Sequence, residues 1–228
     1  MNAMLALYMG NVNDAISKVV SDLRMLMDSQ LNAVVHIADE DDVRAYAASQ
    51  DSRERYQMAY SDVRPIVRSA IQNLPIDNLV IYDTSGAWYQ YQGALTFEEF
   101  RTLRDMFSGL RDATNAMVVL DGALYLCSAA PMLRVDRGEG ILVQDGLVVA
   151  LMSAGTVRTA LPSSDNLASG AILLHDGETI LVSTDAALNG EPLAEGPISY
   201  ADYYVSSEMV LPNLSVTVSV PRDQIFPE

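Results

Sequence analysis

Apolar side chains in the first part of the chain recur at intervals of three and four positions. The members of this stripe are Val12, Ile16, Val19, Leu23, Leu26, Gln30 and Val34. Gln30 is its only polar member. Because this spacing keeps side chains on one face of a helix, it predicts one long helix over residues 11–37. At 1.5 Å per residue, that helix is roughly 40 Å long.

A second stripe with helical spacing follows the acidic run DEDD at residues 39–42. Its members are Val43, Ala47, Tyr56, Tyr60, Val63, Val67 and Ile71. Acidic side chains interact favourably with the dipole at a helix N-terminus. We therefore interpret DEDD as the start of a second helical region, in preference to a metal site.

After Pro75 the pattern becomes that of a sheet. Residues 78–93, NLVIYDTSGAWYQYQG, predict a strand, a turn at residues 83–86 and a second strand. Thr96 and Glu99 have the spacing of a helix capping box. The inner face of the helix that they introduce is formed by Phe100, Leu103, Phe107 and Leu110.

Two Asp-Gly pairs between apolar runs predict hairpins in the next segment. They lie in MVVLDGALYL, residues 117–126, and in ILVQDGLVVALM, residues 141–152. Asp-Gly is a strong hairpin signal because both turn positions need positive φ. Together with the preceding strands, these runs predict an antiparallel five-stranded sheet with helices on one side.

The loop-like run LPSSDN at residues 161–166 predicts a boundary, after which a smaller β-rich region begins. A third Asp-Gly hairpin is expected in residues 170–183, and two final strands are joined through Pro212 and Asn213. In the last strand, valines alternate with serine and threonine up to Pro221, which predicts one buried face and a strand that ends at the proline. The expected parts are residues 1–38, 39–165 and 166–228.

Charge and cysteine content restrict the classes of partner. The chain has 228 residues, a formal net charge of −16 and an apolar fraction of 50%. A folded protein is expected, and nucleic acid or an anionic membrane surface is a poor partner for it. The single cysteine, Cys127, lies in an apolar strand-like run, so we predict a buried structural thiol and no internal disulfide.

The sequence contains no motif that predicts catalysis. His36 and His175 are far apart and lack metal-ligand spacing, and phosphate-binding and dinucleotide-binding glycine motifs are missing from the sequence. We therefore expect no catalytic residue, no metal ligand and no cofactor.

Aromatic side chains are concentrated on the predicted strands of the first sheet. They are Tyr82, Trp88, Tyr89, Tyr91 and Tyr125. Such rings can line a small-molecule pocket, although ordinary sheet packing would also explain them. Alternation along a strand puts Trp88 on the opposite face from Tyr89 and Tyr91. We therefore favour Tyr89 and Tyr91 as ligand-binding residues and place Trp88 in the core or at the rim.

Two segments resemble double-Cache domains, the extracytoplasmic sensors of bacterial transmembrane receptors. They are IDNLVIYDTSGAWYQYQG, residues 76–93, and YYVSSEMVLPNLSVTVSVPRDQIF, residues 203–226. The resemblance implies an α+β fold in which a long N-terminal helix precedes two PAS-like modules, the first larger. The amino-acid-binding members carry an arginine just before the tryptophan that corresponds to Trp88, and this chain lacks it, so no amino-acid ligand is carried over.

The resemblance also implies a function. It indicates a non-enzymatic domain that binds a small molecule outside the cytoplasm as part of a membrane protein, and we favour a sensor histidine kinase as that protein. Transmembrane helices would flank the domain, so Leu5 and Ile225 would lie at the same end, and a homodimer is plausible in the full receptor. A chemoreceptor, a transmembrane regulator and a structural or interaction domain of a surface protein are the alternatives.

Overall fold

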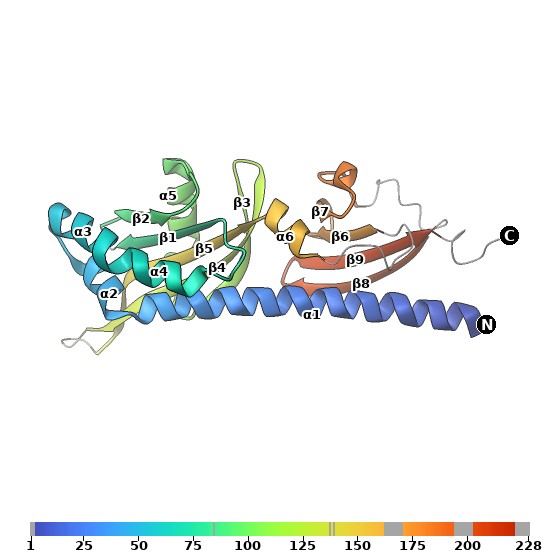
Figure 1. Cartoon of the computed structure of the whole chain (residues 1–228), viewed down its shortest axis with the longest axis horizontal. Helices are drawn as coiled ribbons and strands as arrows, with labels where there is room; N and C mark the ends of the chain where they lie inside the picture. The colour runs from blue at the N-terminus through green and yellow to red at the C-terminus, as the bar shows by residue number, and fades with distance from the viewer. Residues whose placement is uncertain are drawn as a thin grey trace. The chain divides into compact units, whose positions relative to one another are not determined.

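The computed structural model is shown in Figure 1. It describes residues 3–83, 85–136, 138, 140–161, 171–193 and 203–221. The chain divides into two compact units, one of Leu26–Ser153 and one of Met1–Met25 together with Ala154–Glu228. The expected boundary at residues 165 and 166 lies outside the described residues, as does Ile225, so the three-part division and the neighbouring ends remain predictions.

The long N-terminal helix is confirmed as α1, Ala3–Asp39. Its residues up to Met25 belong to one unit and those from Leu26 to the other. The predicted stripe is buried almost throughout, and Gln30 is only 2% exposed. No helix in the part of the chain that the structure describes is long and apolar enough to cross a membrane.

The second helical region is divided into segments. They are α2 (Asp41–Ala48), α3 (Ser52–Met58), the π-helical turn η1 (Ala59–Val63) and α4 (Arg64–Ile71). Asp41 and Asp42 lie in the first turn of α2, as the acidic run predicted. The break before α3 has a local cause, because Ser49 is extended and the Asp51 side chain caps α3 by accepting the backbone N–H groups of Arg53 and Glu54.

The π turn ends at Val63, and Pro65 follows after one further residue, Arg64. The N–H of Arg64 donates to the carbonyl of Ala59, five residues earlier. Pro65 has no N–H to donate to Ser61 and its ring would crowd that carbonyl in a regular helix. The wider turn accommodates the proline without ending the helical path.

The unit Leu26–Ser153 contains a five-stranded antiparallel sheet, as predicted. Its strands are β1 (Asn78–Asp83), β2 (Trp88–Tyr91), β3 (Thr114–Leu120), β4 (Ala123–Val135) and β5 (Leu142–Ser153), in the order β2-β1-β5-β4-β3. Helix α5, Phe97–Met106, begins with the predicted capping box. The Thr96 N–H donates to Glu99 Oε2 at 2.6 Å, and the Glu99 N–H donates to Thr96 Oγ1 at 3.4 Å.

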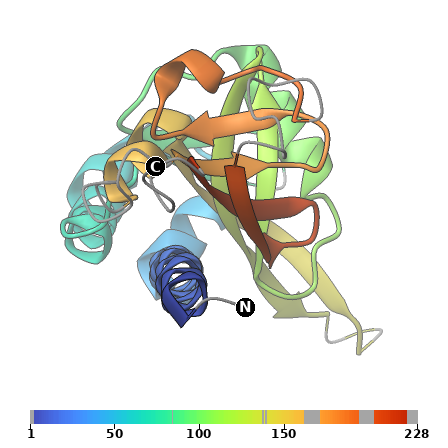
Figure 2. The same ribbon diagram turned by 90° about the vertical axis from the view of Figure 1, so that its right-hand side faces the viewer.

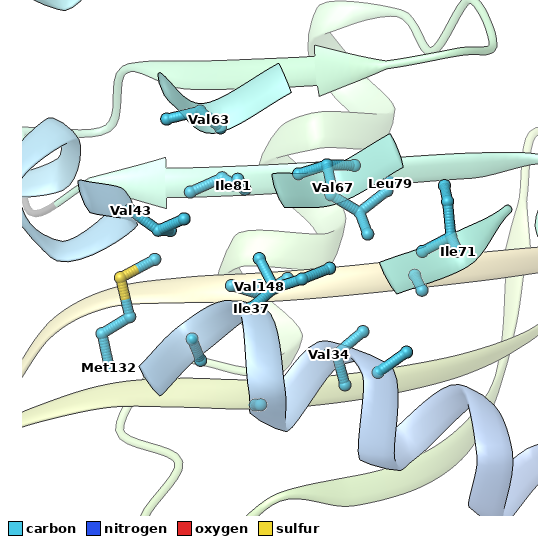
Figure 3. Packing of buried hydrophobic residues seen from close by; sticks show 14 of the residues in the cluster. Val34, Ile37, Val43, Val63, Val67, Ile71, Leu79, Ile81, Met132 and Val148 are labelled. Atoms are coloured by element: carbon cyan, nitrogen blue, oxygen red, sulfur yellow. The ribbon is translucent and has the colours of Figure 1, made fainter. Parts of the chain in front are cut away.

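Helices cover both faces of this sheet, so the prediction of helices on one side is wrong. Figure 3 shows Leu79 and Ile81 of β1 packed with side chains of α1, α2, η1 and α4. The alternate residues Val80 and Tyr82 pack on the other face with α5. All six residues of β1 are buried because successive side chains point into two different cores.

The two Asp-Gly pairs of this unit have different structures. Asp121 and Gly122 form the predicted hairpin turn, with φ angles of 47° and 76°. The hairpin predicted at Asp145 and Gly146 is wrong, because β5 runs through both residues and the register with β4 shifts beside them. A Cβ on Gly146 would lie 2.7 Å from the Tyr82 carbonyl oxygen, so the glycine permits close approach of β1.

The other unit contains a smaller, four-stranded antiparallel sheet. Figure 2 shows it in orange and red. Its strands are β6 (Ala171–His175), β7 (Ile180–Ser183), β8 (Tyr203–Leu211) and β9 (Leu214–Pro221), in the order β7-β6-β9-β8. Short helical segments are α6 (Ala154–Ala160) and η3 (Ala186–Leu188). The third predicted hairpin is confirmed as β6 and β7, and β9 ends at Pro221.

The last strand is buried on both faces, which corrects the expectation of one buried face. Thr217 is 5% exposed and Ser219 1% exposed. β9 is an inner strand of the sheet, and Leu173 lies opposite Thr217 on the same face. Polar side chains are tolerated there because they form hydrogen bonds, such as that between His175 Nε2 and Thr217 Oγ1 at 2.7 Å.

Candidate functional site

A pocket of about 620 Å³ lies between β2 and the helical path from α2 to α4, within the unit Leu26–Ser153. Figure 1 shows these elements beside the first sheet. The pocket is lined by Tyr46, Ser52, Arg55, Tyr56, Ala59, Tyr60, Arg64, Ala87, Trp88, Tyr89, Gln90, Tyr91 and Gln92. Phenols and guanidinium groups thus supply most of its polar lining.

One wall of the pocket is built from side chains four residues apart. Tyr56, Tyr60 and Arg64 line the pocket, and Arg68 continues the same spacing. In a regular α-helix, four residues make more than one full turn, so such a stripe drifts around the helix. The π turn at Ala59–Val63 holds more residues per turn and offsets this drift, which keeps the stripe on one wall.

The opposite wall is the edge of the sheet. β2 is an edge strand, and the Asp83 N–H donates to the Ala87 carbonyl at 3.0 Å. Antiparallel pairing alternates from there, so the main-chain groups of Trp88 and Gln90 point away from β1. These groups have no strand partner within the described sheet, and both residues line the pocket.

A buried ion pair holds one end of the pocket together. Arg55 Nη1 of α3 donates to Asp83 Oδ2 at the end of β1, and the side chains are 21% and 2% exposed. The second carboxylate oxygen of Asp83 accepts Ser85 Oγ at 2.7 Å and the Ala87 N–H at 2.8 Å. Asp83 thereby joins α3 to the β1–β2 turn and has little surface left for a ligand.

Two tyrosines of the pocket, Tyr46 and Tyr89, are hydrogen-bond donors at neutral pH. Tyr46 and Tyr89 meet edge to face with ring centroids 6.2 Å apart. Burial raises the pKa of each phenol to about 12, so both stay protonated. The rings of Tyr56 and Tyr60 lie 4.9 Å apart, and both side chains are mostly exposed although they share helical spacing with the buried Val43, Val63 and Val67.

The structure separates the five aromatic residues that the sequence singled out. Tyr89 and Tyr91 line the pocket, and Trp88 lies at its edge with its ring stacked on Phe100 at 4.6 Å. Two others, Tyr82 and Tyr125, belong to the α5 face. The Tyr82 hydroxyl donates to the Phe100 carbonyl at 2.9 Å.

Several pocket residues were missed by sequence reasoning, notably Tyr46, Arg55 and Arg64. They come from helices that precede the sheet, and no local pattern shows which strand they will face. One usable signal was the four-residue spacing of Tyr56, Tyr60, Arg64 and Arg68, which places polar groups where a core stripe would be apolar.

A larger cavity, about 1020 Å³, lies beside α2 and β4. Its arginines are already paired, Arg44 with Asp39 and Arg134 with Asp145. The described residues of its lining include no aromatic side chain, so we consider the smaller pocket the better ligand site. Among the described residues, no group of three or more potential metal-ligating side chains comes together.

The similarity found between this chain and known proteins is a similarity of structure. No family model and no curated protein sequence matches it. The ligand-binding domain of chemoreceptor Tlp3 from Campylobacter jejuni, solved with 4-methylisoleucine, has a TM-score of 0.70 at 10% identity, over 100% of this chain and 96% of that one.

Two further structures are similar over most of their length. The domain of chemoreceptor CtaA from Pseudomonas fluorescens, solved with L-valine, has a TM-score of 0.58 at 13% identity, over 92% of this chain and 94% of that one. The periplasmic domain of LuxQ from Vibrio cholerae has a TM-score of 0.58 at 14% identity, over 93% of this chain and 99% of that one. The chain therefore shares the fold of these receptor domains, and this is the fold that the resemblance to double-Cache domains implied.

Proposed function

We propose that this chain is the extracytoplasmic ligand-sensing domain of a transmembrane receptor. The observation that carries the proposal is the open pocket between β2 and α3–α4, lined by phenols and guanidinium groups, in a domain with a sensor fold. Tyr89, Tyr91 and Tyr60 are the proposed ligand-contacting residues, with Trp88 at the rim. The domain itself would bind and release its ligand unchanged.

The similar structures support a small-molecule ligand. Tlp3 and CtaA were solved with 4-methylisoleucine and L-valine in their ligand-binding domains. A pocket of about 620 Å³ is large enough for a metabolite of this size. The fold is that of chemoreceptor domains, so a chemoreceptor is supported as well as a histidine kinase.

Ligand binding can be relayed through the packing within this unit. The pocket joins the helical path α3–α4 to the edge of the sheet, so a ligand that contacts both walls favours one spacing between them. Val67 and Ile71 of α4 share a core with Val34 and Ile37 of α1, as Figure 3 shows. A shift of α4 would therefore change the packing of α1 in this shared core.

A thermal-shift screen of acidic, basic and neutral metabolites tests this function. A ligand of the folded state raises the melting temperature increasingly with its concentration. The rise in melting temperature that a stabilising compound causes should be smaller in Tyr60→Ala. It should persist in the control Tyr125→Phe, because the Tyr125 side chain lies on the α5 face.

A screen in which no compound of any charge class stabilises the protein would contradict ligand sensing and favour a structural or interaction domain. A hit that is lost in Tyr125→Phe and kept in Tyr60→Ala would contradict this location of the site.

A further inference from the structure

One end of the candidate pocket carries uncompensated positive charge. Arg64 lines the pocket, and Arg68, one turn later in α4, lines an adjoining hollow of about 440 Å³ that shares Tyr60 and Arg64 with it. Both side chains are exposed, and neither has a carboxylate partner within the described part of the chain. Like charges four residues apart on a helix repel, so a bound anion would relieve this repulsion.

The same pocket offers no free carboxylate to a cationic group. Its described lining contains no aspartate or glutamate. Asp83, the acid paired with the lining residue Arg55, is already engaged by Arg55, Ser85 and Ala87. An ammonium group in the pocket would therefore lose its hydration without gaining a charged partner.

The remaining polar groups around Arg64 also suit an anion. Tyr60 comes four residues before Arg64 and lines both hollows with it, and its hydroxyl can donate a hydrogen bond. The outward main-chain N–H groups of β2 are further donors on the opposite wall. This concentration of donors lies in a chain with a net charge of −16, so the positive charge is local to the site.

We propose that the pocket binds a small organic acid that lacks an ammonium group, with its carboxylate held by Arg64 and Arg68 beside Tyr60. The inference rests on the proposed sensor function and narrows its ligand class. Arginine suits the role because its planar donors match the two oxygens of a carboxylate.

Calorimetric titration with compounds of matched carbon skeleton tests this ligand class. One series is 3-methylbutanoate, L-valine and 3-methylbutanamide, and a second is 3-phenylpropanoate, L-phenylalanine and 3-phenylpropanamide. A third series is butanedioate, L-aspartate and butanediamide. We expect at least one acid to bind, and to bind more tightly than the amino acid and the amide of its own series.

Variants then assign the binding to the arginines. Arg64→Gln and Arg68→Gln should each weaken binding of that acid by about tenfold or more, the usual effect of losing a charged hydrogen bond. Arg64→Lys retains the charge and should weaken binding of the acid less than Arg64→Gln does. Arg53→Gln, on α3 outside the lining, makes the same change in net charge and should leave affinity within about twofold.

Three results would overturn the proposal: an amino acid or amide that binds as tightly as its acid, an unchanged affinity in Arg64→Gln, or no binding by any acid of the three series. If the acids fail while a neutral or cationic metabolite still binds in a manner that depends on Tyr60, the sensor function stands and only the ligand class is wrong.

Discussion

The five-stranded and the four-stranded sheets are both antiparallel, yet their buried faces are filled differently. In the first, helices cover both faces with apolar side chains, and phenols and guanidinium groups line the pocket at the β2 edge. In the second, polar side chains of the inner strands are buried within the sheet itself, as Thr217, Ser219 and His175 show. The first unit thus has polar side chains that line an open pocket, whereas these polar side chains of the second sheet are buried and hydrogen-bond within it.

This difference teaches that a polar residue on a strand is not by itself a sign of solvent or ligand. The Gly177 N–H donates to His175 Nδ1 at 3.1 Å, so Nε2 carries the ring proton and donates to Thr217 Oγ1. Thr217 in turn donates to Ser207 Oγ at 3.1 Å. These groups satisfy one another, whereas Arg64 and Arg68 at the pocket have no carboxylate partner among the described residues.

Removing Arg55 should have the largest effect on stability. Arg55→Gln leaves the Asp83 carboxylate buried without its cation, and we expect a loss of about 3 kcal/mol in the free energy of unfolding, the lower end for buried pairs because Arg55 is 21% exposed. Urea unfolding followed by fluorescence of Trp88, the only tryptophan, measures this loss in the first sheet. The neighbouring control Arg53→Gln should stay within about 0.5 kcal/mol, and equal losses in both variants would contradict the role of the pair.

A methyl group at Gly146 should destabilise the first sheet by about 2 kcal/mol, because its Cβ would press on the Tyr82 carbonyl. Urea unfolding of Gly146→Ala measures the effect. Gly10→Ala in α1 is the control, since a Cβ there meets nothing within 4 Å and should stabilise the helix by up to about 1 kcal/mol. A neutral Gly146→Ala would show that β1 and β5 are not closely apposed at this point.

The buried polar network of the second sheet should contribute less. Thr217→Val keeps the shape of the side chain but leaves the His175 Nε2 proton without an acceptor, so we expect a loss of about 1 kcal/mol. The protection of backbone amides in β6 and β9 from hydrogen exchange measures this loss of stability within the second sheet. Unchanged protection there would mean that the hydrogen bond is not formed in solution.

The smallest effect expected is a pH dependence confined to the second sheet. Burial lowers the pKa of His175 below its ordinary value of 6.5. Between pH 6.5 and the folded-state pKa, His175 is protonated in the unfolded chain and neutral in the folded chain. The free energy of unfolding therefore decreases as the pH is lowered through this range. Hydrogen exchange in β6 at pH 7 and pH 5.5 should show this loss in the parent protein and not in His175→Gln, and a variant that retained the loss would assign it to other groups.

The amino-acid sequence by itself determined the elements whose causes are local. The stripe from Val12 to Val34 specified α1, Thr96 and Glu99 specified the start of α5, and Asp121-Gly122 specified a hairpin. These features depend on periodicity, capping and the φ angles that a few adjacent residues adopt, so they can be read without knowing the rest of the chain.

Only the tertiary structure decided which surfaces those elements share. Asp145-Gly146 has the hairpin signal but lies within β5, because pairing with β1 and β4 outweighs the local turn preference. Tyr56 and Tyr60 share helical spacing with buried residues but remain exposed, and they line a pocket with Tyr89 because the helices pack beside β2. Burial and site geometry depend on contacts between segments distant in sequence, and no periodicity within one segment contains that information.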